Sequence, residues 1–129
     1  MHEIIKELES NNSRLFKESV LLREMQNSND VFFKALSYSC DKLKTFGVKQ
    51  IPISKIDGFG LSWNQFEELL NKLIRRLITG YEARDEIFRI MKQSKSDEWN
   101  FFFRRILMKD LRCGVSEKTI NNVAEKNGF

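Results

Sequence analysis

The sequence predicts an all-α fold, built as a single compact domain of about seven helices over residues 1–129. The chain has only one Pro and six Gly, so it contains few residues that break helices. Apolar residues recur at three- and four-residue spacing, and no stretch shows the strict alternation of a strand. Hydrophobic residues make up 41% of the chain, with 11 Phe, which is enough for one sizeable core.

Three helices are expected in the first part of the chain. Residues 3–9 form a short one, and Ser13 is placed to cap a second. The cluster at residues 27–30 ends that helix and caps a third, which runs to Phe46 with Gly47 as its C′ residue. The residues expected to face inward are Ile4, Ile5, Leu8, Leu15, Phe16, Leu22, Phe32, Ala35, Leu36, Ser39 and Leu43.

Four further helices are expected after an irregular segment, residues 48–61, which holds the only Pro and two Gly. Each helix has a candidate capping residue at its start. These are Ser62 and Thr79, with capping-box partners at Gln65 and Glu82, then Asp97 and Ser116. The apolar stripes are Phe66, Leu69, Leu70, Leu73, Ile74 and Leu77, then Ile87, Phe88, Ile90 and Met91.

Composition narrows the classes of function. The net charge of +4 permits a polyanionic partner without requiring one. The cysteines, Cys40 and Cys113, lie far apart, and the single histidine, His2, is expected at a mobile N-terminus, so no metal site is predicted. No apolar run approaches the roughly 20 residues that span a bilayer, and the charged N-terminus does not resemble a signal peptide. We therefore expect a reduced, cytoplasmic protein without membrane contact.

The tetrapeptide Lys55-Ile56-Asp57-Gly58 matches the Lys-x-Asp-Gly motif of nucleotidyltransferases, which attach a nucleotide to the lysine. The extended motif has an Arg two residues after the glycine, where this chain has Gly60. The lysine should also lie among β-strands, but here it lies between predicted helices. The residues that follow contain none of the later nucleotide-binding motifs. We therefore predict a loop before a capped helix, with no catalytic residue and no self-adenylation at Lys55.

The stretch Phe101–Val123 holds most of the excess positive charge. Five basic residues (Arg104, Arg105, Lys109, Arg112, Lys118) face two acidic ones (Asp110, Glu117) between positions 101 and 118, a local charge of 5 − 2 = +3. A run of three phenylalanines opens this stretch. Its members repeat the helical spacing of the following apolar residues, so core packing is favoured over the stacking of bases.

The turn in this stretch has the geometry of a phosphate site. A helix is expected to end near Leu111, the chain turns at Gly114, and a new helix starts after Ser116. The free N–H groups and the positive end of that helix would face outward, and Gly114 allows close backbone approach. Arg112 and Lys118 flank the turn. The residues alone leave open an ordinary helix–turn–helix corner with solvated charges.

Residues 105–123, RILMKDLRCGVSEKTINNV, resemble the closing segment of the N-terminal DNA-binding domain of ATP-dependent DNA ligases, those of T-even-type bacteriophages above all. The shared pattern is a basic residue, then Leu111-x-x-Gly114-x-Ser116, then a helix carrying Lys118, Thr119 and Val123. Phe59-Gly60 and Ile78-Thr79-Gly80 also fit the phage members. The resemblance covers nearly the whole chain, and its last stretch is the specific part.

The resemblance implies a helical domain that grips duplex DNA, nicked in particular, through the minor groove on both sides of a nick. Carried over residue by residue, the DNA contacts fall at Lys109, Arg112, Gly114 and Ser116, and local geometry adds Lys118. It also implies that the chain is the N-terminal part of a longer ligase, acting as a monomer in replication and repair. ATP and Mg²⁺ would then belong to the parent enzyme, and the adenylation and OB-fold domains lie outside this chain.

One alternative of a different class stays open. The chain could be a helical protein-interaction module that docks on a replication factor. The rim of its interface would then be formed by Arg75, Arg76, Arg104 and Arg105.

Overall fold

Seven helices build the fold, which confirms the all-α architecture predicted from the sequence. The structure is a computed structural model that describes residues 1–129. Five helices come first: α1 (His2–Glu9), α2 (Arg14–Gln26), α3 (Asp30–Cys40), α4 (Trp63–Ile74) and α5 (Gly80–Gln93). The sixth is continuous and has three parts: α6 (Ser96–Glu98), the π-helical turn η1 (Trp99–Phe103) and α7 (Arg104–Leu107). The last is α8 (Glu117–Lys126).

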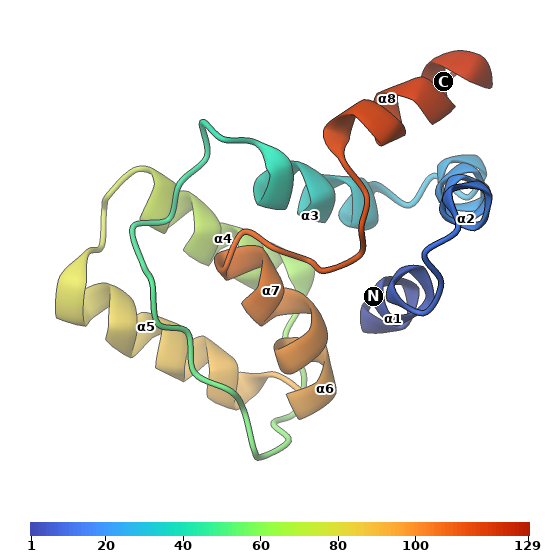
Figure 1. The fold of residues 1–129 in the computed structure, drawn as a ribbon. Helices are drawn as coiled ribbons and strands as arrows, with labels where there is room; N and C mark the ends of the chain where they lie inside the picture. The colour runs from blue at the N-terminus through green and yellow to red at the C-terminus, as the bar shows by residue number, and fades with distance from the viewer.

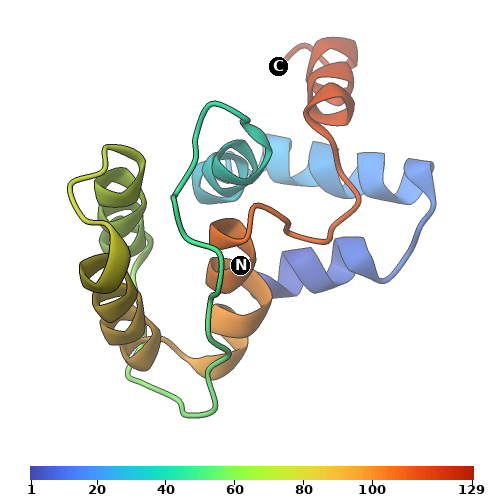
Figure 2. The same ribbon diagram turned by 60° about the vertical axis from the view of Figure 1, so that its left-hand side comes forward.

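The continuous helix α6–η1–α7 lies between two groups of helices. In Figures 1 and 2, α4 and α5 form a pair on one side of it, and α1, α2, α3 and α8 lie on the other. The long segment between α3 and α4 runs along the central helix in both views. None of the helices has the length and apolar character needed to cross a bilayer.

Aromatic side chains form the centre of the core, between α4 and the central helix. Phe66 of α4 packs on Phe103 with ring centroids 4.5 Å apart and meets Trp99 edge-on at 6.4 Å. Trp63 lies 6.2 Å from Phe102. Apart from Trp63, which is half-buried, these rings are almost completely buried. The prediction that the phenylalanine run packs in the core is confirmed for Phe102 and Phe103, whereas Phe101 is only half-buried.

Four helices begin at capping residues that the sequence predicts. Ser13, Asn29, Ser62 and Ser116 each accept a hydrogen bond from the backbone N–H three residues on, at 3.2–3.4 Å, and Ser62 completes its capping box. Each such cap contributes about 0.5–2 kcal/mol to stability. The second predicted capping box is wrong, because Thr79 stands at the N-cap position of α5 but accepts no cap hydrogen bond.

Two helices end earlier than predicted. α3 ends at Cys40 rather than Phe46, and Leu43, expected to face inward, is 91% exposed. α4 ends at Ile74, so Leu77 is 61% exposed. In each case a basic side chain donates hydrogen bonds to carbonyls at the helix end. Arg76, which follows α4, donates to the carbonyl of Leu73 in that helix and to that of Thr45 in the preceding loop. Lys109 donates to the carbonyls of Tyr38 and Asp41 at the end of α3.

The buried face of α2 differs from the predicted one. Leu15 is 78% exposed, and Phe16 and Leu22 are half-buried. The buried residues of this helix are Lys17, Val20, Leu21 and Glu24. Two of these are charged, and each has polar partners that offset the loss of hydration. The helix is therefore rotated relative to the predicted stripe so that two charges, not two apolar side chains, complete the buried face.

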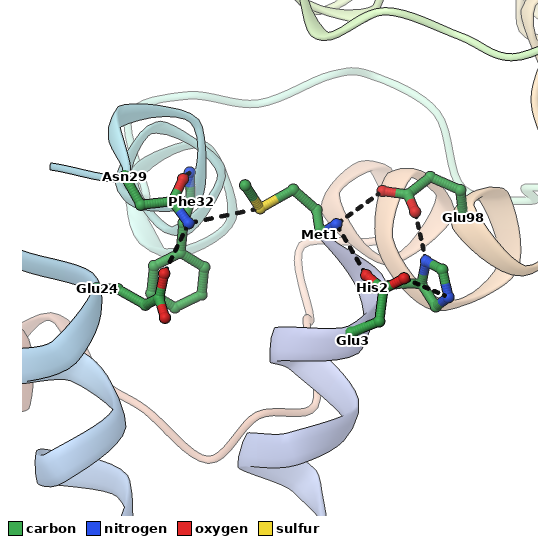
Figure 3. Close-up of polar contacts among 7 residues, drawn as sticks. All are labelled: Met1, His2, Glu3, Glu24, Asn29, Phe32 and Glu98. Atoms are coloured by element: carbon green, nitrogen blue, oxygen red, sulfur yellow. Dashed lines mark hydrogen bonds and ion pairs between the residues drawn. The ribbon is translucent and has the colours of Figure 1, made fainter. Parts of the chain in front are cut away.

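The N-terminus is held rather than mobile (Figure 3). A ring nitrogen of His2 hydrogen-bonds to the Glu98 carboxylate, and its other nitrogen lies 3.5 Å from Glu3. The Met1 ammonium lies 3.2 Å from Glu3 and 3.4 Å from Glu98. One side-chain nitrogen or oxygen atom from each of His2, Glu3 and Glu98 lies within 4.8 Å of the other two. We interpret this cluster as a polar clasp that joins the start of α1 to α6.

Candidate nucleic-acid interface

The turn between α7 and α8 forms one wall of an open groove of about 760 Å³, and the end of α3 forms the other. All five residues predicted to contact DNA line this groove, and the structure therefore brings them together. They are Lys109, Arg112, Gly114, Ser116 and Lys118. Lys42, which follows α3, adds a further exposed cation on the opposite wall.

The turn is built from backbone in the left-handed region. Lys109, Arg112 and Gly114 have φ of 62°, 57° and 66°. For a residue with a Cβ this conformation costs roughly 1–2 kcal/mol, so the surrounding contacts must hold it in place. The Asp110 carboxylate accepts the Arg112 N–H at 2.9 Å, and Cys113 is buried beneath the turn. The backbone at Lys109 and Arg112 is therefore strained and is held in that conformation by its surroundings.

Lys17 holds the turn from inside the protein. Lys17 is buried, with 8% of the residue exposed. Its ammonium donates to the carbonyls of Cys113 at 2.6 Å and Leu8 at 2.9 Å. A Cβ atom at position 114 would lie 2.5 Å from this nitrogen. Gly is thus favoured at position 114 for two reasons, its positive φ and the closeness of Lys17.

Of the five predicted DNA contacts, Lys109 has the most hydrogen bonds to other parts of the protein. Its ammonium donates to the carbonyls of Tyr38, Asp41 and Lys44, at 2.7, 2.6 and 2.6 Å. Loss of hydration lowers the pKa of Lys109, and nearby Asp41 opposes that effect. Since an ammonium has three protons, all its donors are used here. Its observed role is to hold the end of α3, and a phosphate contact by Lys109 stays a prediction.

Arg112, Ser116 and Lys118 are exposed in the groove. The Ser116 hydroxyl accepts the Thr119 N–H, while the first two N–H groups of α8 have no intrahelical acceptor. Four basic residues (Lys42, Lys109, Arg112, Lys118) line the groove beside two acidic ones (Asp110, Glu117). Arg104 lies in α7, before this turn, and its pKa is lowered first by burial and then by the nearby charges of Arg112 and Arg105.

The Lys-x-Asp-Gly segment has a structural explanation. The Asp57 carboxylate accepts the Ser96 N–H at 2.8 Å and so caps α6, a bond that holds the pKa of Asp57 below its usual value. This replaces the predicted cap at Asp97. A Cβ at Gly58 would lie 2.3 Å from backbone oxygens at the end of α5. Lys55 is exposed, unlike the desolvated lysine that a nucleophile requires.

Three of the four arginines assigned to a protein-docking rim are used inside the domain. Arg105 is 5% exposed and pairs with Glu9 at 2.9 Å. Arg104 donates to the Ile51 carbonyl at 2.9 Å, and Arg76 binds the Thr45 carbonyl at the same distance. Only Arg75 is exposed without such a contact.

Two contributors to the site are not evident from the sequence. Lys42 falls inside the predicted third helix, so its charge does not point to the groove. A lysine among apolar residues of an amphipathic helix, such as Lys17, is usually exposed. Its spacing from Val20, Leu21 and Glu24, at i+3, i+4 and i+7, is the one signal that could have placed it on the buried face.

The whole domain is similar to solved structures that are ligase-related. Chains named Pmar-Lig_Pre and Pmar-Lig_PreS3 are each 45% identical to this chain, with TM-scores of 0.93 and 0.94. The alignments cover 97% and 98% of this chain but 29% and 30% of those chains. No protein-family model and no curated protein matches the sequence. The comparisons indicate a ligase-related domain, which spans less than a third of the length of the solved chains.

Proposed function

We propose that this chain is the DNA-binding domain of an ATP-dependent DNA ligase of the T-even phage type, acting in replication, repair and recombination. It binds duplex DNA at nicks without sequence preference, through phosphates along the minor groove. The observation that carries the proposal is the basic groove around the Gly114 turn, in a chain similar to ligase-related structures. In this role the domain positions DNA and does not perform chemistry.

The groove suits a phosphate backbone for three physical reasons. Free N–H groups at the start of α8 offer hydrogen bonds to anionic oxygens, and the helix dipole favours negative charge there. Gly114 supplies the left-handed backbone, with a φ of 66°, that shapes the exposed turn next to these N–H groups. Arg112, Lys118 and Lys42 supply charge on both walls. Such contacts fix the position of DNA but carry no base information.

The sealing reaction would belong to the rest of a longer polypeptide. Catalytic domains on that polypeptide would bind ATP and Mg²⁺ and carry the nucleophilic lysine, while this domain holds the nicked duplex against them. The parent protein would act as a monomer in the cytoplasm of the phage host. The solved chains, more than three times as long as the segment they share with this one, support this arrangement.

A module that docks on a replication factor is the competing function. It has less support, because three of its four rim arginines are bound to groups of the domain itself. The two functions differ in a simple property: a nonspecific DNA-binding domain binds any duplex and does so more tightly at low salt.

The test is binding of labelled nicked and intact duplexes to the chain over a salt series. The three exposed cations of the groove should give a slope of log affinity against log salt of about −3. Exchange of the duplex sequence should leave the affinity unchanged. Absence of binding at low salt would overturn the proposal in favour of protein docking.

A further inference from the structure

The segment between Ile51 and Gly60 has no regular secondary structure, yet it is bonded to helices along its length. The carbonyls of Ile51 and Pro52 accept bonds from Arg104 and Trp99, each at 2.9 Å. Ser54 exchanges two bonds with Asn100, at 2.8 and 2.9 Å. Asp57 caps α6, and the N–H groups of Gly58 and Gly60 bond to the end of α5. We call residues 51–60 the stapled segment.

This rigid segment displays large apolar side chains to solvent. Ile53 is 60% exposed, Ile56 78% and Phe59 102%. Loops that expose apolar groups by chance are usually mobile, whereas this one has its backbone fixed by helix side chains and carbonyls. A preorganised apolar surface of this kind is typical of a contact site, because little entropy is lost on binding.

The surroundings of these side chains are basic. Lys49, Lys55 and Lys95 are exposed on or beside the stapled segment. The nearby acids are Asp57, which is engaged at the start of α6, and the exposed Asp97 of that helix, so the three lysines outnumber them. Apolar side chains flanked by lysines match a partner with an anionic exterior and an apolar interior, which is the character of a DNA duplex.

The stapled segment lies along the central helix, whose C-terminal end leads into the Gly114 turn. It runs antiparallel to the central helix, with position 51 beside Arg104 and position 57 beside Ser96 (Figures 1 and 2). That helix has 12 residues, 96–107, and so is about 18 Å long. About 18 Å corresponds to roughly five base pairs at 3.4 Å each, so one duplex is long enough to reach both sites.

We propose that Ile56 and Phe59 insert as apolar wedges into the minor groove of the duplex that the Gly114 groove holds, with Lys55 on an adjacent phosphate. The inference rests on the proposed function and adds a second contact to it. Apolar wedges partly unstack a base step, which is cheapest where the backbone is already interrupted. The stapled segment would therefore supply preference for a nick, while the Gly114 groove supplies general affinity.

The test compares Phe59→Ser and Ile56→Ser with the wild-type chain, on nicked and intact duplexes over the same salt series. Each variant should bind nicked duplex about tenfold more weakly with an unchanged salt slope, since an apolar contact releases no counterions. Leu15→Ser is the matched control, because Leu15 is 78% exposed, as Ile56 is, but lies on α2. A 2-aminopurine placed at the nick should brighten with wild type and not with Phe59→Ser.

Failure of this inference and failure of the proposed function give different results. If the wild-type chain binds no DNA, the proposed function is overturned. If it binds with a steep salt slope but both serine variants bind as tightly as wild type, the wedge is wrong, and protein docking becomes the competing explanation of the exposed apolar side chains. A reduced salt slope in Phe59→Ser would also contradict the wedge, because it would show that phosphate contacts had been lost instead.

Discussion

The ammonium of Lys17 lies 2.5 Å from the point that a Cβ atom on Gly114 would occupy. The same ammonium donates to the carbonyl of Cys113, 96 positions away along the chain. The turn that opens the basic groove is therefore shaped by a buried charge on α2. Its geometry depends on the packing of α1 and α2 as much as on its own residues.

Gly114→Ala should destabilise the domain by more than the roughly 1–2 kcal/mol of a left-handed backbone alone. The reason is that the methyl group collides with Lys17 and weakens its bond to the Cys113 carbonyl. Gly80→Ala is the matched control, since Gly80 has a φ of +55° but open space around it. Urea unfolding measures both. Equal losses at the two positions would show that Lys17 moves aside at little cost.

The double change Arg112→Ala with Lys118→Ala should weaken duplex binding and leave the free energy of unfolding nearly unchanged. Both side chains are exposed and neither supports the turn through its charged group. Because each cation contributes about 0.9 to the slope of log affinity against log salt, the slope should become shallower by about two. Fluorescence anisotropy with labelled duplex measures it. Unchanged affinity at low salt would contradict the placement of the site in this groove.

Lys109→Met should act mainly on stability. Three carbonyls near the end of α3 lose a charged donor, and bonds of this class contribute about 1.5–3 kcal/mol each at best. Lys42→Met is the comparison within the same groove. It removes an exposed cation and should weaken DNA binding with little effect on unfolding. If Lys109→Met binds DNA less tightly while remaining as stable as wild type, Lys109 contacts phosphate directly.

The parts of the fold that sequence could predict are those set by near neighbours. Ser62 and Gln65 lie three residues apart, and their capping box forms as the local pattern indicates. Phe66, Leu69, Leu70 and Leu73 occupy one face of a helix whatever surrounds it, and all four are buried. The five predicted groove residues all lie between positions 109 and 118, around one turn. A correct prediction of that turn was therefore enough to bring all five together.

The parts that could not be predicted depend on distant partners. The end of α3 is fixed by Lys109, whose acceptors at Tyr38 and Asp41 lie 71 and 68 positions away. The buried face of α2 is fixed by the carbonyl that Lys17 meets at position 113. Nothing near these residues in sequence reveals such contacts. Both lysines stabilise backbone that apolar periodicity alone would assign to a longer helix or a different face.

Trp63→Phe should be neutral or slightly stabilising, whereas Trp99→Phe should destabilise. The indole N–H of Trp63 is buried without a partner, an arrangement that costs roughly 1–3 kcal/mol. The indole N–H of Trp99 donates to the Pro52 carbonyl at 2.9 Å and helps hold the stapled segment. Thermal unfolding of the two variants measures the difference. A clear loss of stability in Trp63→Phe would mean that its ring volume matters more than the unpaired N–H.

Stability should fall at high pH through Tyr38. Its hydroxyl donates to Glu67 at 2.9 Å, and burial, followed by that carboxylate, raises the pKa of Tyr38 to about 12. An unfolded tyrosine has a pKa near 10. Because the folded value is higher, the stabilisation is fully present below about pH 10 and is lost as the pH rises toward about 12.

Comparison with Tyr38→Phe isolates this effect from the titration of lysines, which both proteins share. The difference in free energy of unfolding between wild type and variant should be constant up to about pH 10 and shrink above it. Tyr81→Phe serves as the control, since Tyr81 is 77% exposed, and its difference from wild type should not shrink in that way. A constant difference for Tyr38→Phe would show that the Tyr38 hydroxyl is hydrated in the folded state. The bond between α3 and α4 would then contribute packing of the ring rather than a buried polar link.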